Sequence, residues 1–159
     1  MNKAWLLILP LLVGSTAFGL TLATDGKPQV DIIVAAEANL AEQQAATELG
    51  DYLTRIIGAP VAVVKPGEAT LMSAHVYVGP TGPAIRAGLL PDKLGPEEWV
   101  IRAAGRDLIV TGGRPRGTLY AVYHLLEDVL GVYWWNPWEE TVPAARTLEL
   151  KLTELRGQP

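Results

Sequence analysis

Hydrophobic positions in the first half of this chain follow a strand spacing and then a helical spacing. Residues 30–35 (VDIIVA) form a short run rich in β-branched side chains and bounded by turn formers, which is typical of a buried strand. Asn39 then stands at an N-cap position with Glu42 three residues later, as in a capping box, and Gly58 ends the apolar spacing. The pattern predicts an amphipathic helix over residues 39–57.

The second half repeats this alternation and adds a hairpin. Residues 97–112 contain two β-rich runs joined by a Gly-Arg-Asp turn, which predicts an antiparallel pair of strands. The other expected elements are strands at residues 61–64, 75–78, 132–135 and 147–152 and a second helix at residues 117–130. Together these elements predict an α/β (α+β) fold, a two-layer domain with a mixed β-sheet and two principal helices.

The N-terminus has the features of a secretory signal peptide. Within residues 1–19, Lys3 precedes an apolar run at 4–13, and small residues follow. Cleavage after Gly19 is expected, and cleavage after Ala23 is the alternative. The apolar run is shorter than the roughly 20 residues that a membrane-spanning helix needs, although an uncleaved anchor is a second interpretation. We therefore expect a secreted or periplasmic protein without a membrane span after cleavage.

Composition and charge narrow the choice of partners. The chain of 159 residues is 49% hydrophobic and 19% charged, the balance of one globular domain. Without the expected leader it keeps 12 basic and 17 acidic residues, a formal charge of −5, so nucleic acid and anionic membranes are not expected partners. It has no cysteine, which excludes disulfides and a lipid-attachment cysteine.

Motifs for metal, nucleophilic and phosphate chemistry are incomplete in this sequence. The two histidines, His75 and His124, are far apart, so we expect no zinc site. Ser73 lacks a G-x-S-x-G elbow. Residues 112–118 have the glycine spacing of a phosphate loop, but Thr118 stands where the lysine belongs. No cofactor is predicted.

Paired acids are the remaining catalytic option, because glycosidases need two carboxylates across one sugar bond. The acidic doublets are Glu97-Glu98, Glu127-Asp128 and Glu139-Glu140. Neighbours on a strand point to opposite faces and neighbours on a helix diverge by about 100°, so no doublet converges on one bond. Solvated surface charge is the better interpretation, and the domain alone is not expected to be an enzyme.

Two arginines precede the second predicted helix. Arg114 and Arg116 lie where exposed backbone N–H groups and the helix dipole favour anions, which makes them candidate substrate-binding residues. The alternative is that they are solvated or paired with acids of the same chain.

Aromatic residues near the end of that helix form a second candidate binding site. Trp134, Trp135 and Trp138 can offer indole faces to a sugar ring or to another domain. Because side chains alternate along a strand, one member of the Trp134–Trp135 pair should be buried and the other exposed. If Val132 packs inward, Trp134 does too and Trp135 faces out.

The run RPRGTLYAVYHLLEDVLGVYWWNP, with AEQQAATELGDYLTRIIGAPVAV and HVYVGPT, resembles the N-terminal domain of α-glucuronidases and related secreted glycoside hydrolases. It is also similar to the domain that precedes the catalytic barrel of β-N-acetylhexosaminidases. The resemblance implies an accessory domain over residues 24–155, with 156–159 beginning a linker to a barrel that the chain lacks. The barrel would hold the catalytic carboxylates.

The resemblance implies a non-catalytic accessory domain of a secreted glycoside hydrolase acting on uronic-acid or amino-sugar polysaccharides. The alternative is a free-standing secreted carbohydrate-binding module that uses the arginines and tryptophans above. An independent hydrolase is a third interpretation. The expected partner is therefore carbohydrate or a glycosidase barrel.

Overall fold

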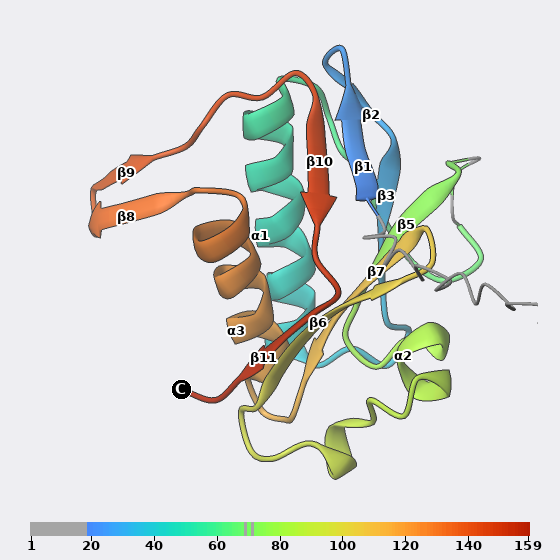
Figure 1. Ribbon diagram of the computed structural model, residues 1–159. Coiled ribbons are helices and arrows are strands. Elements are labelled where there is room, and N and C mark those ends of the chain that lie inside the picture. The colour runs from blue at the N-terminus through green and yellow to red at the C-terminus, as the bar shows by residue number, and fades with distance from the viewer. Residues whose placement is uncertain (1–18, 69, 71) are drawn as a thin grey trace, which may run out of the picture.

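A six-stranded mixed sheet forms the centre of the protein in the computed structural model, which describes residues 19–68, 70 and 72–159 (Figure 1). Its strands are β3 (Val30–Val34), β4 (Val63–Val64), β5 (Ala74–Val78), β6 (Trp99–Ala104), β7 (Asp107–Gly112) and β11 (Glu154–Gly157). They are arranged in the order β11-β6-β7-β5-β3-β4. The pairs β4–β3, β3–β5 and β5–β7 are parallel, whereas β6 is antiparallel to both β7 and β11. The predicted mixed sheet and the hairpin within residues 97–112 are confirmed.

Two helices, α1 (Leu40–Ile57) and α3 (Gly117–His124), cover one face of this sheet. Helix α1 has the predicted capping box, in which Asn39 and Glu42 each accept a hydrogen bond from the other's backbone N–H, and Gly58 ends it in the left-handed conformation. The predicted second helix is confirmed over α3, but its last part, Leu125–Val129, is a π-helical turn. The main core lies between these helices and the sheet.

The opposite face of the sheet is covered by different elements. The short helix α2 (Gly82–Arg86) and the 3-10 turn Pro91–Lys93 lie on that side. A second small core joins them to β6 and β7 and consists of Ala84, Leu89, Leu94, Val100 and Ile109. Ile33 of β3 is buried on this face but belongs to neither core. The second core therefore does not extend over β3.

The N-terminal boundary of the fold lies earlier than the sequence indicated. Strand β1 (Gly19–Thr24) pairs with β2 (Lys27–Pro28) and β10 (Leu148–Lys151) in a three-stranded antiparallel sheet. Leu22 and Ala23 are buried in the main core, so residues 19–23 are part of the domain and not outside it. The expected signal peptide otherwise falls on residues 1–18, which lie outside the described residues.

The C-terminal boundary also differs from the expected limit at residue 155. Arg156 and Gly157 of β11 pair with Val100 and Trp99 of β6, so the expected linker at 156–159 begins inside the sheet. The backbone of Gly157 lies against the Trp99 indole, where an added Cβ would be 2.7 Å from Cζ2. A side chain would not fit there, which explains the glycine at this position.

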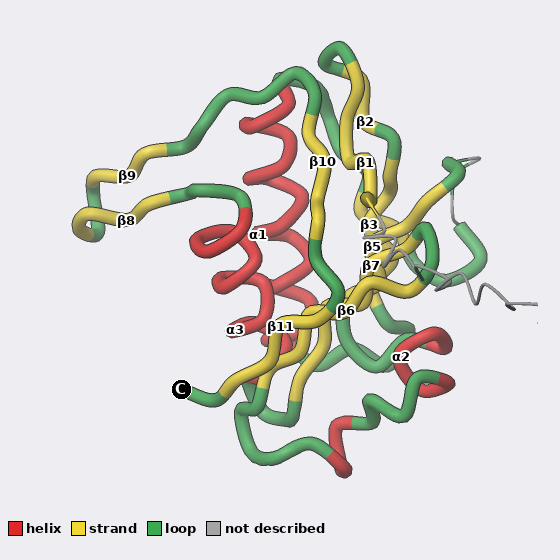
Figure 2. The backbone as a smooth tube through the Cα atoms, viewed as in Figure 1, coloured by secondary structure: helices red, strands yellow, loops and turns green. Residues whose placement is uncertain are grey.

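Strands β8 (Tyr133–Asn136) and β9 (Glu139–Thr141) form a separate antiparallel hairpin. Figure 2 shows this hairpin in yellow, projecting from the molecule beyond α3 on the side away from α2. The predicted strand at 132–135 thus exists but does not join the central sheet. In the part of the chain that the structure describes, no helix is both long and apolar enough to cross a membrane.

Candidate functional site

The glycines of the β7–α3 turn are required by close backbone packing. An added Cβ would lie 2.5 Å from the Glu98 carbonyl oxygen at Gly112, 2.3 Å from the same oxygen at Gly117, and 1.9 Å from the Gly95 carbonyl oxygen at Gly113. The N–H of Gly113 also donates to the Glu98 carbonyl oxygen at 2.8 Å. The phosphate-loop spacing in the sequence therefore reflects one backbone segment crossing another.

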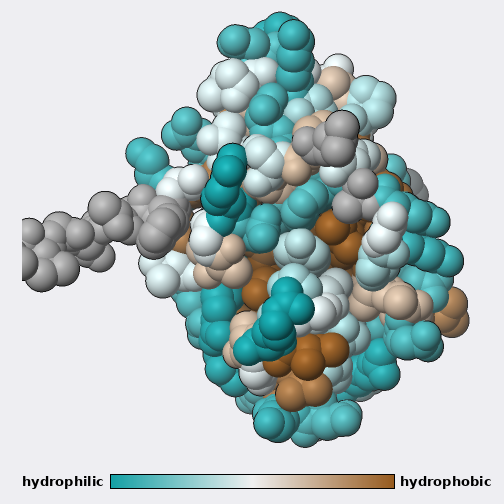
Figure 3. Space-filling model, turned by 90° about the vertical axis from the view of Figure 1, so that its right-hand side faces the viewer, coloured by the Kyte–Doolittle hydropathy of each residue, from teal (hydrophilic) through white to brown (hydrophobic). Residues whose placement is uncertain are grey.

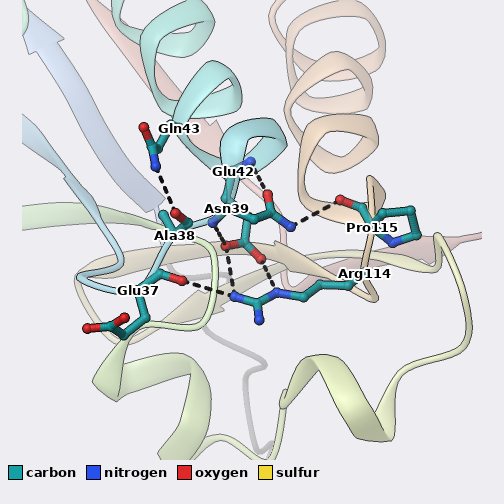
Figure 4. A network of polar contacts seen from close by, with 7 residues as sticks. All are labelled: Glu37, Ala38, Asn39, Glu42, Gln43, Arg114 and Pro115. Atoms are coloured by element: carbon teal, nitrogen blue, oxygen red, sulfur yellow. Dashed lines mark hydrogen bonds and ion pairs between the residues drawn. The ribbon is translucent and has the colours of Figure 1, made fainter.

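Arg114 projects from this turn to the beginning of α1 (Figure 4). Its Nε and Nη2 atoms donate to the Glu42 carboxylate at 3.1 and 3.2 Å, and Nη2 also donates to the Glu37 carbonyl oxygen at 3.0 Å. The Glu42 side chain is only 2% exposed and accepts the Asn39 N–H at 2.7 Å. The hydrogen bond to Glu42 raises the pKa of Arg114. Arg114 thus compensates a buried carboxylate and joins the turn to α1.

Arg116 lies on the surface and points elsewhere. Its guanidinium forms an ion pair with Glu97 at 2.6 Å and lies 5.6 Å above the centre of the Tyr120 ring. The two arginines that the sequence grouped as substrate-binding residues are therefore each paired with a different acid of the same chain. This is the arrangement that the alternative interpretation described, and the structure does not bring them together around one anion.

The two neighbouring tryptophans of β8 face opposite ways, as strand alternation predicted. Val132 is fully buried, and Trp134 packs inward with ring centroids 5.6 Å from Tyr52 and 5.4 Å from Tyr123, edge to face. Its Nε1 donates to the Tyr52 hydroxyl at 2.8 Å. Trp135 is 63% exposed. The predicted division between an inward Trp134 and an outward Trp135 is confirmed, although Trp134 is half-buried.

The outward side of the hairpin carries an exposed aromatic pair. Tyr133 and Trp135 contact one another with ring centroids 4.7 Å apart, and we call them the outer aromatic pair. The Trp135 indole is held in place because its Nε1 donates to Thr141 of β9 at 3.0 Å. Two large aromatic rings in a fixed orientation form a surface suited to recognition.

A groove of about 410 Å³ lies between the inward side of the hairpin and α1, and we call it the hairpin groove. It is lined by Tyr52, Trp134, Asn136, Pro137, Trp138, Glu139 and Glu140. Trp138, in the turn of the hairpin, is 91% exposed, and its backbone N–H donates to Oδ1 of Asn136 at 2.9 Å. An exposed indole beside an amide and two carboxylates can contact a sugar ring.

Glu140 joins the hairpin to α1 through two side chains that the sequence did not identify. The Tyr52 hydroxyl donates to Glu140 at 2.5 Å, and Arg55 forms an ion pair with Glu140 at 2.6 Å. These hydrogen bonds lower the pKa of Glu140, so the carboxylate stays ionised at neutral pH. An ionised acid held by two partners is poorly placed to donate a proton to a glycosidic oxygen.

Four of the six acids in the acidic doublets, including Glu140, pair with a basic side chain. Glu97 and Glu98 pair with Arg116 and Arg156 respectively. Asp128 pairs with His124 within one helical segment. Among residues 19–68, 70 and 72–159, no group of three or more histidine or acidic side chains is arranged to hold a metal ion.

A comparison with protein families gives one match. The family described as the glycosyl hydrolase family 67 N-terminus matches residues 21–125, about two thirds of the chain. The chain belongs to this family. The match confirms the resemblance to α-glucuronidase N-terminal domains, and it covers both helices and most of the central sheet. A search of curated proteins gives no match to the chain.

The boundaries of the family match separate two parts of the molecule. The glycine turn and the Arg114–Glu42 pair lie within the matched residues of this family 67 domain, whereas the β8–β9 hairpin follows them. The chain is thus an N-terminal accessory domain of glycoside hydrolase family 67.

Replacing Arg114 with methionine should destabilise the domain by about 2 kcal/mol, because Glu42 would remain buried without its cation. The loss is smaller than for a fully buried pair, since Arg114 is about half exposed. Urea unfolding of R114M measures it. R116M is the matched control and should unfold near the parent midpoint, because its ion pair is exposed. Equal midpoints for R114M and the parent would contradict the structural role of Arg114.

Trp134→Ala should cost about 2–4 kcal/mol of unfolding free energy, because it removes an indole packed on two tyrosines and the hydrogen bond to Tyr52. Trp135→Ala should change the unfolding free energy little, because Trp135 is largely exposed. Chemical denaturation of both variants measures the difference. Large and equal losses would show that both faces of β8 are buried in solution.

Proposed function

We propose that this family 67 domain is the non-catalytic accessory part of a secreted glycosidase acting on uronic-acid or amino-sugar polysaccharides, with catalysis in a separate barrel domain. Family membership supports the glycosidase context. Four of the six acids in the doublets pair with arginine, histidine or tyrosine side chains, which supports a non-catalytic role. Export follows from the signal-like sequence, and cleavage after Gly19 fits better than cleavage after Ala23, which would remove most of β1.

The proposal for how the domain contacts its partner rests on the outer aromatic pair. Tyr133 and Trp135 are 50% and 63% exposed on a hairpin that projects away from the central sheet (Figure 2). Tyrosine and tryptophan are enriched at the buried centres of protein interfaces, where they often dominate the binding energy. The hairpin is tied to α1 by the bonds among Trp134, Tyr52 and Glu140, so little ordering entropy is lost on contact. We infer that this pair docks against the catalytic barrel.

The hairpin groove supports a second function, carbohydrate binding. Trp138 presents an almost fully exposed indole, and the Asn136 amide and the Glu139 carboxylate lie beside it. Aromatic faces bind the apolar side of sugar rings, and the polar groups can bond hydroxyls. The groove and the outer aromatic pair lie on different sides of one hairpin, so single substitutions separate the two functions.

Titration calorimetry with a family 67 catalytic barrel, and separately with glucuronoxylan fragments, tests both functions. Trp135→Ser should weaken barrel binding by about thirtyfold, the effect of losing one interface anchor, and leave sugar binding unchanged. Trp138→Ser should weaken sugar binding and leave barrel binding unchanged. Leu40→Ser is the matched control, because Leu40 is 84% exposed on α1 and distant from the hairpin.

Equal barrel affinity of the parent and Trp135→Ser would reject the docking role. Hydrolysis of glucuronoxylan fragments by the purified domain that disappears in Glu139→Gln would reject the non-catalytic role.

A further inference from the structure

The central sheet has a pocket on the face opposite α1 and α3. It lies over β3 and β5, which the second core does not cover. Its volume is about 320 Å³, at the lower end of the range for small-molecule sites. Its walls include the apolar residues Ile33, Pro66 and Pro83 and the polar residues His75, Tyr77 and Thr81. Figure 3 shows the α2 side of the molecule, where small brown hydrophobic areas are separated by teal hydrophilic ones. A mostly apolar pocket with a few polar groups is the usual composition of a ligand site.

A buried carboxylate fixes the orientation of the histidine in this pocket. Asp31 is fully buried directly beside His75 in the β3–β5 register, and it accepts hydrogen bonds from His75 Nδ1 and from the N–H and hydroxyl of Thr70, both at 2.8 Å. Burial alone would raise the pKa of Asp31, but these bonds outweigh it and lower the pKa. The ionised Asp31 therefore accepts the Nδ1–H of His75, which fixes the orientation of the ring and directs Nε2 away from Asp31. No group of the described residues hydrogen-bonds to Nε2.

Two hydroxyl groups in the pocket also lack partners among the described residues. The Tyr77 ring lies edge to face with His75, 5.8 Å between centroids, and its hydroxyl makes no hydrogen bond within the described chain. Burial and the charges of Asp107 and Asp31 raise its pKa, so the phenol stays protonated. The Thr81 hydroxyl oxygen is buried and also unpaired. Polar groups without partners are costly in apolar surroundings, and a ligand hydroxyl would satisfy those it can reach.

Two carboxylates and one arginine lie near the pocket. Asp31 accepts a hydrogen bond from Nδ1 of the His75 ring, and Asp107 accepts one from the backbone N–H of His75 at 2.9 Å, so two carboxylates lie next to this residue. The positive charge of Arg86 opposes the effect of these carboxylates on Tyr77, because it lowers the pKa of the phenol. We infer that the pocket binds an uncharged, hydroxyl-bearing ring compound of the size of one sugar unit. One hydroxyl of the ligand forms a hydrogen bond with Nε2 of His75, another with the Tyr77 hydroxyl, and the ring lies against the apolar walls.

This binding site is separate from the proposed docking hairpin. Figure 1 places β8 and β9 on the side of the molecule opposite α2 and β5. The two sites can therefore be tested independently, and loss of one function does not predict loss of the other.

Nuclear magnetic resonance of the histidine rings tests the inference, because the chain contains two histidines. His124 is the internal control, since it stacks on Trp99 at 4.1 Å and bonds Asp128, outside the pocket. The probes are the methyl pyranosides of xylose, glucose and N-acetylglucosamine, with glucuronate as the charged comparison. At least one neutral probe should shift the His75 signals saturably below about 50 mM, as expected for millimolar affinity, while His124 stays unchanged.

Glucuronate should bind at least about tenfold more weakly than that neutral probe, because of the two nearby carboxylates. The inference is overturned if no neutral probe shifts His75, or if glucuronate binds as tightly as the best of them.

Tyr77→Phe should weaken binding of that probe by about fivefold or more, because it removes one hydrogen-bonding group of the site. It should leave the unfolding midpoint unchanged, since the hydroxyl has no partner among the described residues. Tyr120→Phe on α3 is the matched control, and its affinity should equal that of the parent. Equal probe affinities for Tyr77→Phe and Tyr120→Phe would place the ligand elsewhere and reject the site.

Discussion

The rest of the structure depends on one close crossing of two backbone segments. Residues 112–117 pass residues 95–98 so closely that glycine is the one residue type that fits at three positions of the turn. The crossing ends β7, begins α3 and brings the intervening Arg114 to the first turn of α1. Both helices and the antiparallel half of the sheet are therefore positioned by a contact that leaves no room for a phosphate or a sugar.

The conspicuous residues of the sequence fall into two groups, those that contact other parts of the domain and those that are exposed. The glycine turn packs against residues 95–98, and its two arginines form ion pairs within the chain. Four of the six acids in the doublets also form ion pairs. The β8–β9 hairpin, in contrast, exposes aromatic rings that the domain itself does not cover. This division supports the proposed role of the chain as a non-catalytic accessory domain of a family 67 glycosidase.

The sequence predicted the elements whose signals are local. Asn39 and Glu42 mark the start of α1, Gly58 marks its end, and the turn at residues 105–107 marks the β6–β7 hairpin. Strand alternation with Val132 predicted the orientation of both tryptophans.

Elements that depend on distant partners were missed. Strand β1 pairs with residues near the C-terminus, and this long-range pairing left no local signal, so residues 19–23 were expected to lie outside the domain. Tyr52 and Glu140 lie 88 positions apart, and no spacing rule connects them. The pair of Asp31 and His75 did leave a signal, because each is the second residue of its strand and neighbouring parallel strands in register place these side chains side by side. A charged residue in a buried strand needs a partner, which directs attention to the histidine.

Hydrogen–deuterium exchange of the domain, alone and with excess family 67 catalytic barrel, tests most directly whether the hairpin and not the arginine turn is the recognition surface. Backbone amides of residues 133–141 should become protected when the barrel is added. Amides of residues 112–118 should exchange at the same slow rate in both samples, because the Gly113 and Gly117 N–H groups are already bonded within the domain. New protection at residues 112–118 with none at 133–141 would contradict the assignment and make the arginine turn the binding surface.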